Sequence, residues 1–278
     1  MDTALHRLLR LAVASLLLSA AWGHLYWEAP YRAALEAQPE VAAAWQVAPE
    51  DGDHIALGFG IWFLVAGVVT VLGRPGWLVR TILIFTLIPL ALLVASDAAL
   101  QSPAWRGILI RSWWLGATLT LAIVGRGWSR AERLFLRAGL TAVFATWAVE
   151  GLGYLGAVPE GWLEVVRIYW PGGHGDVFHV QVLSGLLLGG CVCLWIRPLV
   201  PAGAILLALS GLAGIGVPLG GKLDGSALEF WHRWMPEAAG KAGLAVLPVA
   251  VWLAGGSRRR LRPEPRRLKR VETPADEV

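Results

Sequence analysis

Histidines that fall toward one side of a series of apolar segments are the residues of this sequence best suited to chemistry. Neutral imidazole is a ligand for zinc, copper and haem iron. The most suggestive stretch is GGHGDVFH, in which the carboxylate of Asp176 lies between His174 and His179. His54 begins an earlier apolar segment. We predict a metal or haem site formed by His54, His174 and His179. The alternative is that these imidazoles are hydrogen-bonded to water or lipid headgroups.

Two charged residues inside apolar segments form a second group of candidates. Glu150 falls about two turns from the outer end of its predicted segment. Arg111 falls about one turn into another and could pair with Glu150 or with Asp97. Ionisable side chains are costly in lipid, so they are candidates for function. We predict that Glu150 and Arg111 join the histidines in binding a cofactor near the outer face. The alternative is an ion pair that fixes helix register.

The elements that position these residues are long apolar segments. Hydrophobic residues make up 56% of the 278 residues and charged residues only 16%, against about a quarter in soluble domains. The apolar segments match the hydrocarbon thickness of a bilayer and are continuous rather than alternating, which predicts helices. We therefore predict an all-α transmembrane bundle with the lipid bilayer around it. The predicted spans are residues 8–25, 54–72, 78–95, 107–124, 134–157, 178–196, 202–217 and 242–254, eight in all.

The distribution of charge predicts how the bundle is oriented. The segment at 28–53 holds six acidic residues and one arginine, whereas the loops on the side of the N-terminus are rich in arginine. By the positive-inside rule, both termini are cytoplasmic and the protein lies in a bacterial inner membrane. The net charge of +4 comes mostly from a basic tail at 258–270. It therefore indicates orientation and no nucleic-acid partner.

The outer boundary of the bilayer is predicted to hold a short helix and a belt of tryptophans. Pro39 is suited to the first position of a helix that lies on the interface, and residues 161–169 are its expected partner in the second half. Indole rings favour the headgroup region. Nine of the sixteen tryptophans fall near predicted boundaries: Trp22, Trp27, Trp77, Trp105, Trp128, Trp162, Trp170, Trp231 and Trp234.

An internal duplication is indicated between the second and sixth predicted spans. Asp53, Gly67 and Arg74-Pro75 recur 123 residues later as Asp176, Gly190 and Arg197-Pro198. We predict two tandem four-helix units, residues 1–128 and 129–256, followed by a disordered tail at 257–278. Units with an even number of spans share one orientation, which implies a pseudo-twofold axis along the membrane normal and a cleft between the halves. The first run could instead be a cleaved signal peptide, but it has a counterpart in the second unit.

The motifs of the chain also carry a resemblance. The stretch GHLYWEAPYRA at 23–33, and EGLGY at 150–154 followed by Pro159 and Trp162, resemble a group of bacterial multi-span proteins built like tandem DoxX-type four-helix units. In that group a histidine is expected before the glycine, where this chain has Glu150. The resemblance implies the fold, and the loose link of DoxX-type proteins to redox, quinone or thiol-stress systems implies a redox role. The closer group has no assigned reaction.

Three functions are compatible with these observations. The first is a membrane protein that binds a redox cofactor, a metal or a quinone near the outer face. The second is a small-solute or proton-coupled transporter that uses the cleft, with helices broken near Pro89 or Pro248. The third is a non-catalytic subunit that binds a membrane protein partner. The identity of the cofactor and the question of enzymatic activity stay open. A hydrolase has little support, because no serine or cysteine lies near a plausible base.

Overall fold

The computed structural model describes residues 3–26, 30–73, 76–101, 103–123, 130–154, 162–163, 166–167, 176–220, 231–232 and 235–256. These residues form helices and no β-strand, which confirms the all-α prediction. Eight of the helices contain 20–24 residues: α1 (Thr3–Tyr26), α4 (Asp51–Leu72), α5 (Trp77–Leu100), α6 (Ala104–Ile123), α7 (Arg130–Gly151), α9 (Asp176–Trp195), α10 (Val200–Gly220) and α12 (Met235–Gly256).

Five stretches of the described chain are helical, long and apolar enough to cross a bilayer. They are His6–Tyr26, Asp51–Leu72, Trp77–Leu100, Val177–Trp195 and Arg197–Ile215, the last of which begins in the 3₁₀ turn η1 (Arg197–Leu199). The chain is therefore a helical membrane protein. The three other long helices, α6, α7 and α12, carry charged side chains such as Arg106, Glu150 and Lys241 along with their apolar residues.

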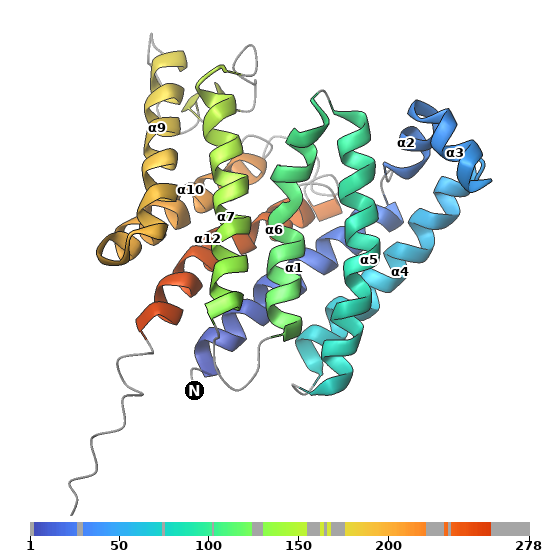
Figure 1. Ribbon diagram of the computed structural model, residues 1–278, viewed down its shortest axis with the longest axis horizontal. Helices are drawn as coiled ribbons and strands as arrows, with labels where there is room; N and C mark the ends of the chain where they lie inside the picture. Colours follow the sequence, from blue (N-terminus) through green and yellow to red (C-terminus); the bar gives the residue numbers. More distant parts are fainter. Residues whose placement is uncertain are drawn as a thin grey trace, which may run out of the picture.

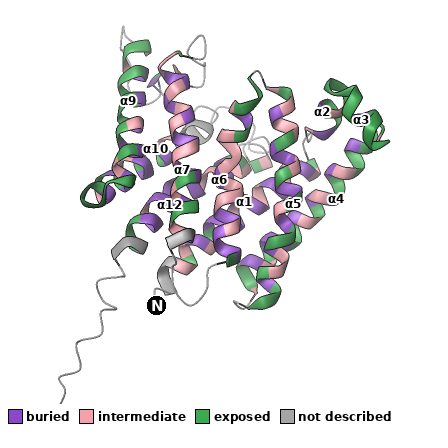
Figure 2. Ribbon diagram, viewed as in Figure 1, coloured by how far each residue is buried: buried purple, intermediate pink, exposed green. Residues whose placement is uncertain are grey.

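The helices are arranged around four central members (Figure 1). The four helices α1, α6, α7 and α12 form a central square, in which α6 and α12 each pack against both α1 and α7. Helices α4 and α5 flank the square on one side, and α9 and α10 flank it on the other. The central helix α1 is more buried than the flanking helices. Half of the residues in its apolar span are buried, whereas a third are buried in the spans of α4, α9 and α10. Figure 2 shows the exposed residues concentrated on the flanking helices.

One end of the central square is filled with apolar side chains. Leucine and valine side chains from all four helices meet there in a close-packed core. This filled end is made by residues that are at most 4% exposed: Leu9, Val13, Leu121, Leu136, Leu140, Leu247 and Val251. On the same side, the Arg10 guanidinium donates hydrogen bonds to the carbonyls of Thr70 and Gly73, which caps the last turn of α4.

The segment between α1 and α4 contains two short helices, α2 (Tyr31–Ala37) and α3 (Pro39–Trp45). The predicted start at Pro39 is confirmed, because this proline is the first residue of α3. Val41 and Trp45 of α3 are exposed. Of the segment predicted as its partner in the second half, only residues 162–163 and 166–167 are described.

The fifth predicted span is too long at its C-terminal end. Helix α7 ends at Gly151 rather than near 157. The amide of Gly153 donates to the carbonyl of Glu150, and the left-handed φ of 79° at Gly153 favours glycine. Glu150 therefore lies in the last turn of α7, and its predicted position two turns inside the span is wrong.

Candidate functional site

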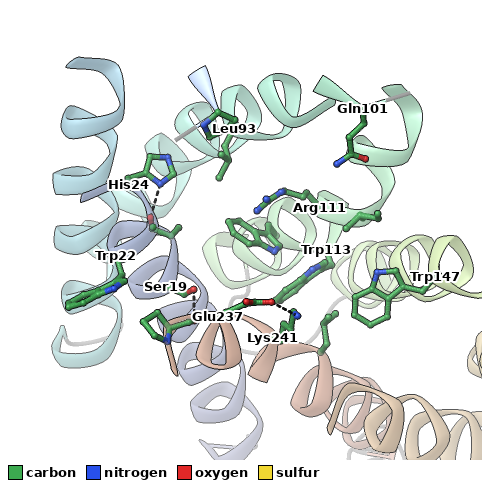
Figure 3. A pocket seen from close by; sticks show the side chains of 18 residues that line it. Ser19, Trp22, His24, Leu93, Gln101, Arg111, Trp113, Trp147, Glu237 and Lys241 are labelled. Atoms are coloured by element: carbon green, nitrogen blue, oxygen red, sulfur yellow. Dashed lines mark hydrogen bonds and ion pairs between the residues drawn. The ribbon is translucent and has the colours of Figure 1, made fainter. Parts of the chain in front are cut away.

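A cavity of about 580 Å³ opens at the end of the central square opposite the filled end (Figure 3). All four central helices contribute to its wall, so it lies between the two predicted halves of the chain. Residues of α5 and Pro30, just before α2, complete it. The lining residues are Ser19, Ala20, Trp22, Gly23, His24, Pro30, Leu93, Gln101, Ile110, Arg111, Trp113, Trp114, Trp147, Pro236, Glu237, Gly240, Lys241 and Leu244.

Four indole rings form much of this wall. Trp22 comes from α1, Trp113 and Trp114 from α6, and Trp147 from α7. The Trp22 indole N–H donates to the carbonyl of His232 at 2.7 Å, which fixes its ring plane. Gly243 of α12 gives room for the Trp113 ring, because a Cβ at this glycine would lie 2.6 Å from it. Tryptophans from three of the four central helices therefore line the cavity.

Two cations reach the cavity from different helices. The Nε group of Arg111 on α6 forms an ion pair with Asp97 of α5, and its guanidinium carbon lies 4.7 Å from the centre of the Trp114 ring. Lys241 on α12 forms an ion pair of 2.7 Å with Glu237 one turn earlier. Each cation is thus held in place by a carboxylate while it still has N–H groups to donate.

His24 lines the cavity, but both of its ring nitrogens are engaged. Its Nδ1 lies 2.7 Å from the carbonyl of Ala20, which can only accept, so Nδ1 carries the hydrogen. Its Nε2 then accepts from the Tyr31 hydroxyl at 2.9 Å. Burial, with a further contribution from the Asp97 charge, raises the pKa of Tyr31 above its ordinary value of 10. The hydroxyl therefore stays protonated and able to donate, and His24 joins α1 to α2.

The structure brings only part of the predicted site together. Arg111 lies in the cavity, paired with Asp97, one of its two predicted partners. Glu150 is 6% exposed and pairs with Arg106 instead. His54 lies near the start of α4 and His179 near the start of α9, which stand on opposite sides of the central square (Figure 1).

The predicted metal site depends on a residue outside the described part of the chain. His174 is that residue. Within the described residues, no group of three or more His, Cys, Asp or Glu side chains is placed to hold a metal ion. His54 and His179 do not combine to form one, since their helices are separated by the central square.

Several lining residues were not among the sequence-based candidates. Lys241 was expected to have only a structural role, as an ion pair or a snorkelling side chain, and Trp147 and Gln101 received no role. The Oε1 atom of Gln101 is buried and has no hydrogen-bond partner among the described residues. The signal that could have found Lys241 is its similarity to Arg111, because each is a cation about two turns from the N-terminal end of its helix.

The chain matches no protein-family model, and comparisons with curated proteins and with solved structures likewise find no match.

Proposed function

We propose that all eight long helices span a bacterial inner membrane, with both termini cytoplasmic, and that the protein binds a small, flat, mainly apolar molecule of the quinone class in its cavity. The observation that carries this proposal is the composition of the cavity wall. It combines four indole rings with the N–H donors of Arg111 and Lys241. Flat rings pack on indole faces, and carbonyl oxygens accept from cationic donors.

The size and polarity of the cavity support this class of ligand. Its 580 Å³ lies within the range of about 300–1,000 Å³ usual for small-molecule sites. The charges of Arg111 and Lys241 are balanced by Asp97 and Glu237, so these four groups carry no net charge, which suits a neutral ligand. The carboxylate of Glu237, which also lines the cavity, can accept from a hydroxyl group. A quinone and its reduced hydroquinone therefore both have partners in the wall.

Eight spans are supported by where the more polar helices lie. Helices α6, α7 and α12 belong to the central square, and α4, α5, α9 and α10 stand between the square and its surroundings on two sides. A central helix faces other helices more than lipid, so it tolerates charges that a lipid-facing helix would not. Long antiparallel neighbours such as α6 and α7 also fit an up-and-down bundle.

Transport through the cavity receives less support. Helices α5 and α12 continue without a break through Pro89 and Pro248, whereas broken helices were the expected mark of a transporter. The filled end also closes the central square beyond the cavity. Both observations favour a binding site that opens toward one end.

The proposal is tested with the purified protein in detergent and 1,4-naphthoquinone as the probe. Quinones quench indole fluorescence on contact, so binding should give saturable quenching at one probe per chain. The Trp147→Leu variant should bind about 3- to 10-fold more weakly, because it loses one aromatic contact. Trp77→Leu is the matched control, since Trp77 is 77% exposed and lies outside the cavity. Linear quenching that is the same in all three proteins would show only partition into detergent and would overturn the proposal.

A further inference from the structure

The packing of the first predicted unit recurs in the second. Helix α1 packs on α4 as α7 packs on α9, α4 meets α5 as α9 meets α10, and α5 packs on α6 as α10 packs on α12. The contacts inside the central square repeat as well: α6 with α7 corresponds to α12 with α1, and α1 with α6 corresponds to α7 with α12. This pattern is what two like units related by a twofold axis through the square would produce.

The close contacts inside the square give the register of this relation. A Cβ at Gly139 of α7 would lie 3.2 Å from the Cα of Trp113, and one at Gly243 of α12 would lie 3.7 Å from the carbonyl of Ala12. Gly139 and Ala12 are 127 residues apart, as are Arg137 and Arg10 at the start of the same helices. Trp113 and Gly243 are therefore equivalent positions on α6 and α12.

Arg111 and Lys241 each lie two residues before these equivalent positions. They are thus counterparts in the two units. Helices α6 and α12 occupy opposite corners of the central square, because each packs against α1 and α7. Figure 3 shows the two cations reaching the cavity from different helices, with indole rings beside them.

Both cations retain donors that can be directed at a ligand. The ion pair of Arg111 uses Nε, which leaves the two Nη groups, and that of Lys241 uses one of three N–H bonds. Their carboxylate partners lie on different sides of the cavity, Asp97 on α5 and Glu237 on α12. Each cation is therefore anchored separately, so the two donors can remain apart when a ligand binds.

We propose that Arg111 and Lys241 are equivalent hydrogen-bond donors of one site. Its ligand is a flat ring with two oxygen acceptors at opposite ends, as in a para-quinone. One oxygen accepts from Arg111 and the other from Lys241, while the ring packs on the tryptophans. This inference rests on the proposed function, since it requires that a flat molecule binds in the cavity.

The test compares 1,4-naphthoquinone, which has two opposed carbonyls, with 1-tetralone, which has one. Binding of each is measured by calorimetry to the wild type, to Arg111→Gln, to Lys241→Gln and to the double variant. For the dione, each single change should weaken binding about 10-fold and the double change about 100-fold, because separate hydrogen bonds to charged donors contribute additively. For the monoketone, which can bind either way round, each single change should cost only about twofold and the double change about 10-fold.

Two controls separate the loss of a hydrogen-bond donor from the loss of folding. Arg111→Gln leaves the Asp97 carboxylate unpaired, so this change is also made in combination with Asp97→Asn. Every variant must keep the wild-type melting temperature within a few degrees. Arg32→Gln, on the exposed face of α2, should not change binding. If the double variant binds the dione no more weakly than the weaker-binding single variant does, both cations donate to the same oxygen. That result would overturn the inference of two separate donors. If neither probe binds the wild type, the proposed function itself fails, and the inference of two separate donors fails with it.

Discussion

The two ends of the central square are built from the same four helices but are held in different ways. At the filled end, leucine and valine side chains meet in direct contact and are almost fully buried. At the cavity end, polar contacts also join neighbouring helices. Arg106 of α6 pairs with Glu150 of α7, Arg111 of α6 pairs with Asp97 of α5, and Ser19 of α1 donates to the carbonyl of Pro236.

This difference indicates how a cavity persists in a bundle that would otherwise collapse on itself. Apolar packing has no fixed distance other than contact, so it closes any gap that side chains can fill. Ion pairs and hydrogen bonds hold two helices at a defined separation and lose energy when that separation changes. The filled end therefore supplies stability, and the polar end supplies shape.

The largest expected effect is on stability at the filled end. Leu140→Ala removes a fully buried side chain from α7 and should lower the free energy of unfolding by about 2–5 kcal/mol, since the rigid surroundings leave a void. Ile110→Ala, in the cavity wall, should cost about 1 kcal/mol or less, because this side chain already borders open space. Thermal unfolding in detergent measures both. Equal losses for the two variants would contradict the division between the ends.

The Arg106–Glu150 pair should give an intermediate effect. Glu150→Gln removes the charge from a carboxylate that is 6% exposed and leaves Arg106 without its partner, which should cost about 1–3 kcal/mol. It should also weaken probe binding, because α6 and α7 lose the contact that spaces them at the cavity.

The double variant Arg106→Gln with Glu150→Gln provides the control for this pair. Replacing both charged groups should recover part of the lost stability, since no unpaired charge remains. A double variant as unstable as the sum of the two single changes would show that the two residues act independently.

The smallest expected effect concerns the hydrogen bond between Tyr31 and His24. Burial raises the pKa of Tyr31, so the folded protein holds this proton more tightly than the unfolded chain does. The stability that depends on the proton is complete below pH 10 and falls as the pH rises above that value. Tyr31→Phe should lose about 1 kcal/mol at neutral pH and show a flatter decline between pH 9 and 11. Unfolding followed across this pH range distinguishes the two proteins, and identical slopes would exclude Tyr31 as the titrating group.

Much of the fold could be predicted from the sequence because the signals are local. Each apolar run became one long helix, and Pro39 begins a helix as its fixed φ favours. The one clear error, at the end of α7, arose because Leu152 and Ala157 continue the apolar run past Gly151. There the glycine turn determined the end of the helix, and hydropathy did not.

The site was less predictable because it depends on which helices become neighbours. Arg111 was recognised as a charge in an apolar segment, but Asp97 and Glu150 were equally good partners until the packing of α5 against α6 was known. Trp22 was assigned to the membrane boundary, although it is one of the residues that line the cavity. Arg111 and Lys241 lie 130 residues apart in sequence, and their equivalence requires the register of two helix pairs, which no local pattern contains.

The contact between α1 and α12 has a consequence for how the protein is made. These helices are the first and the last of the long helices in the described chain, and they pack against each other along one side of the central square. Because translation proceeds from the N-terminus, α1 is synthesised before the other long helices and α12 after them. Helix α1 therefore has no contact with α12 until the intervening helices have been made. During that time the hydroxyl of Ser19 lacks the Pro236 carbonyl, and the cavity lacks one wall. The cavity is therefore complete only after α12, the last long helix of the described chain, has packed against α1.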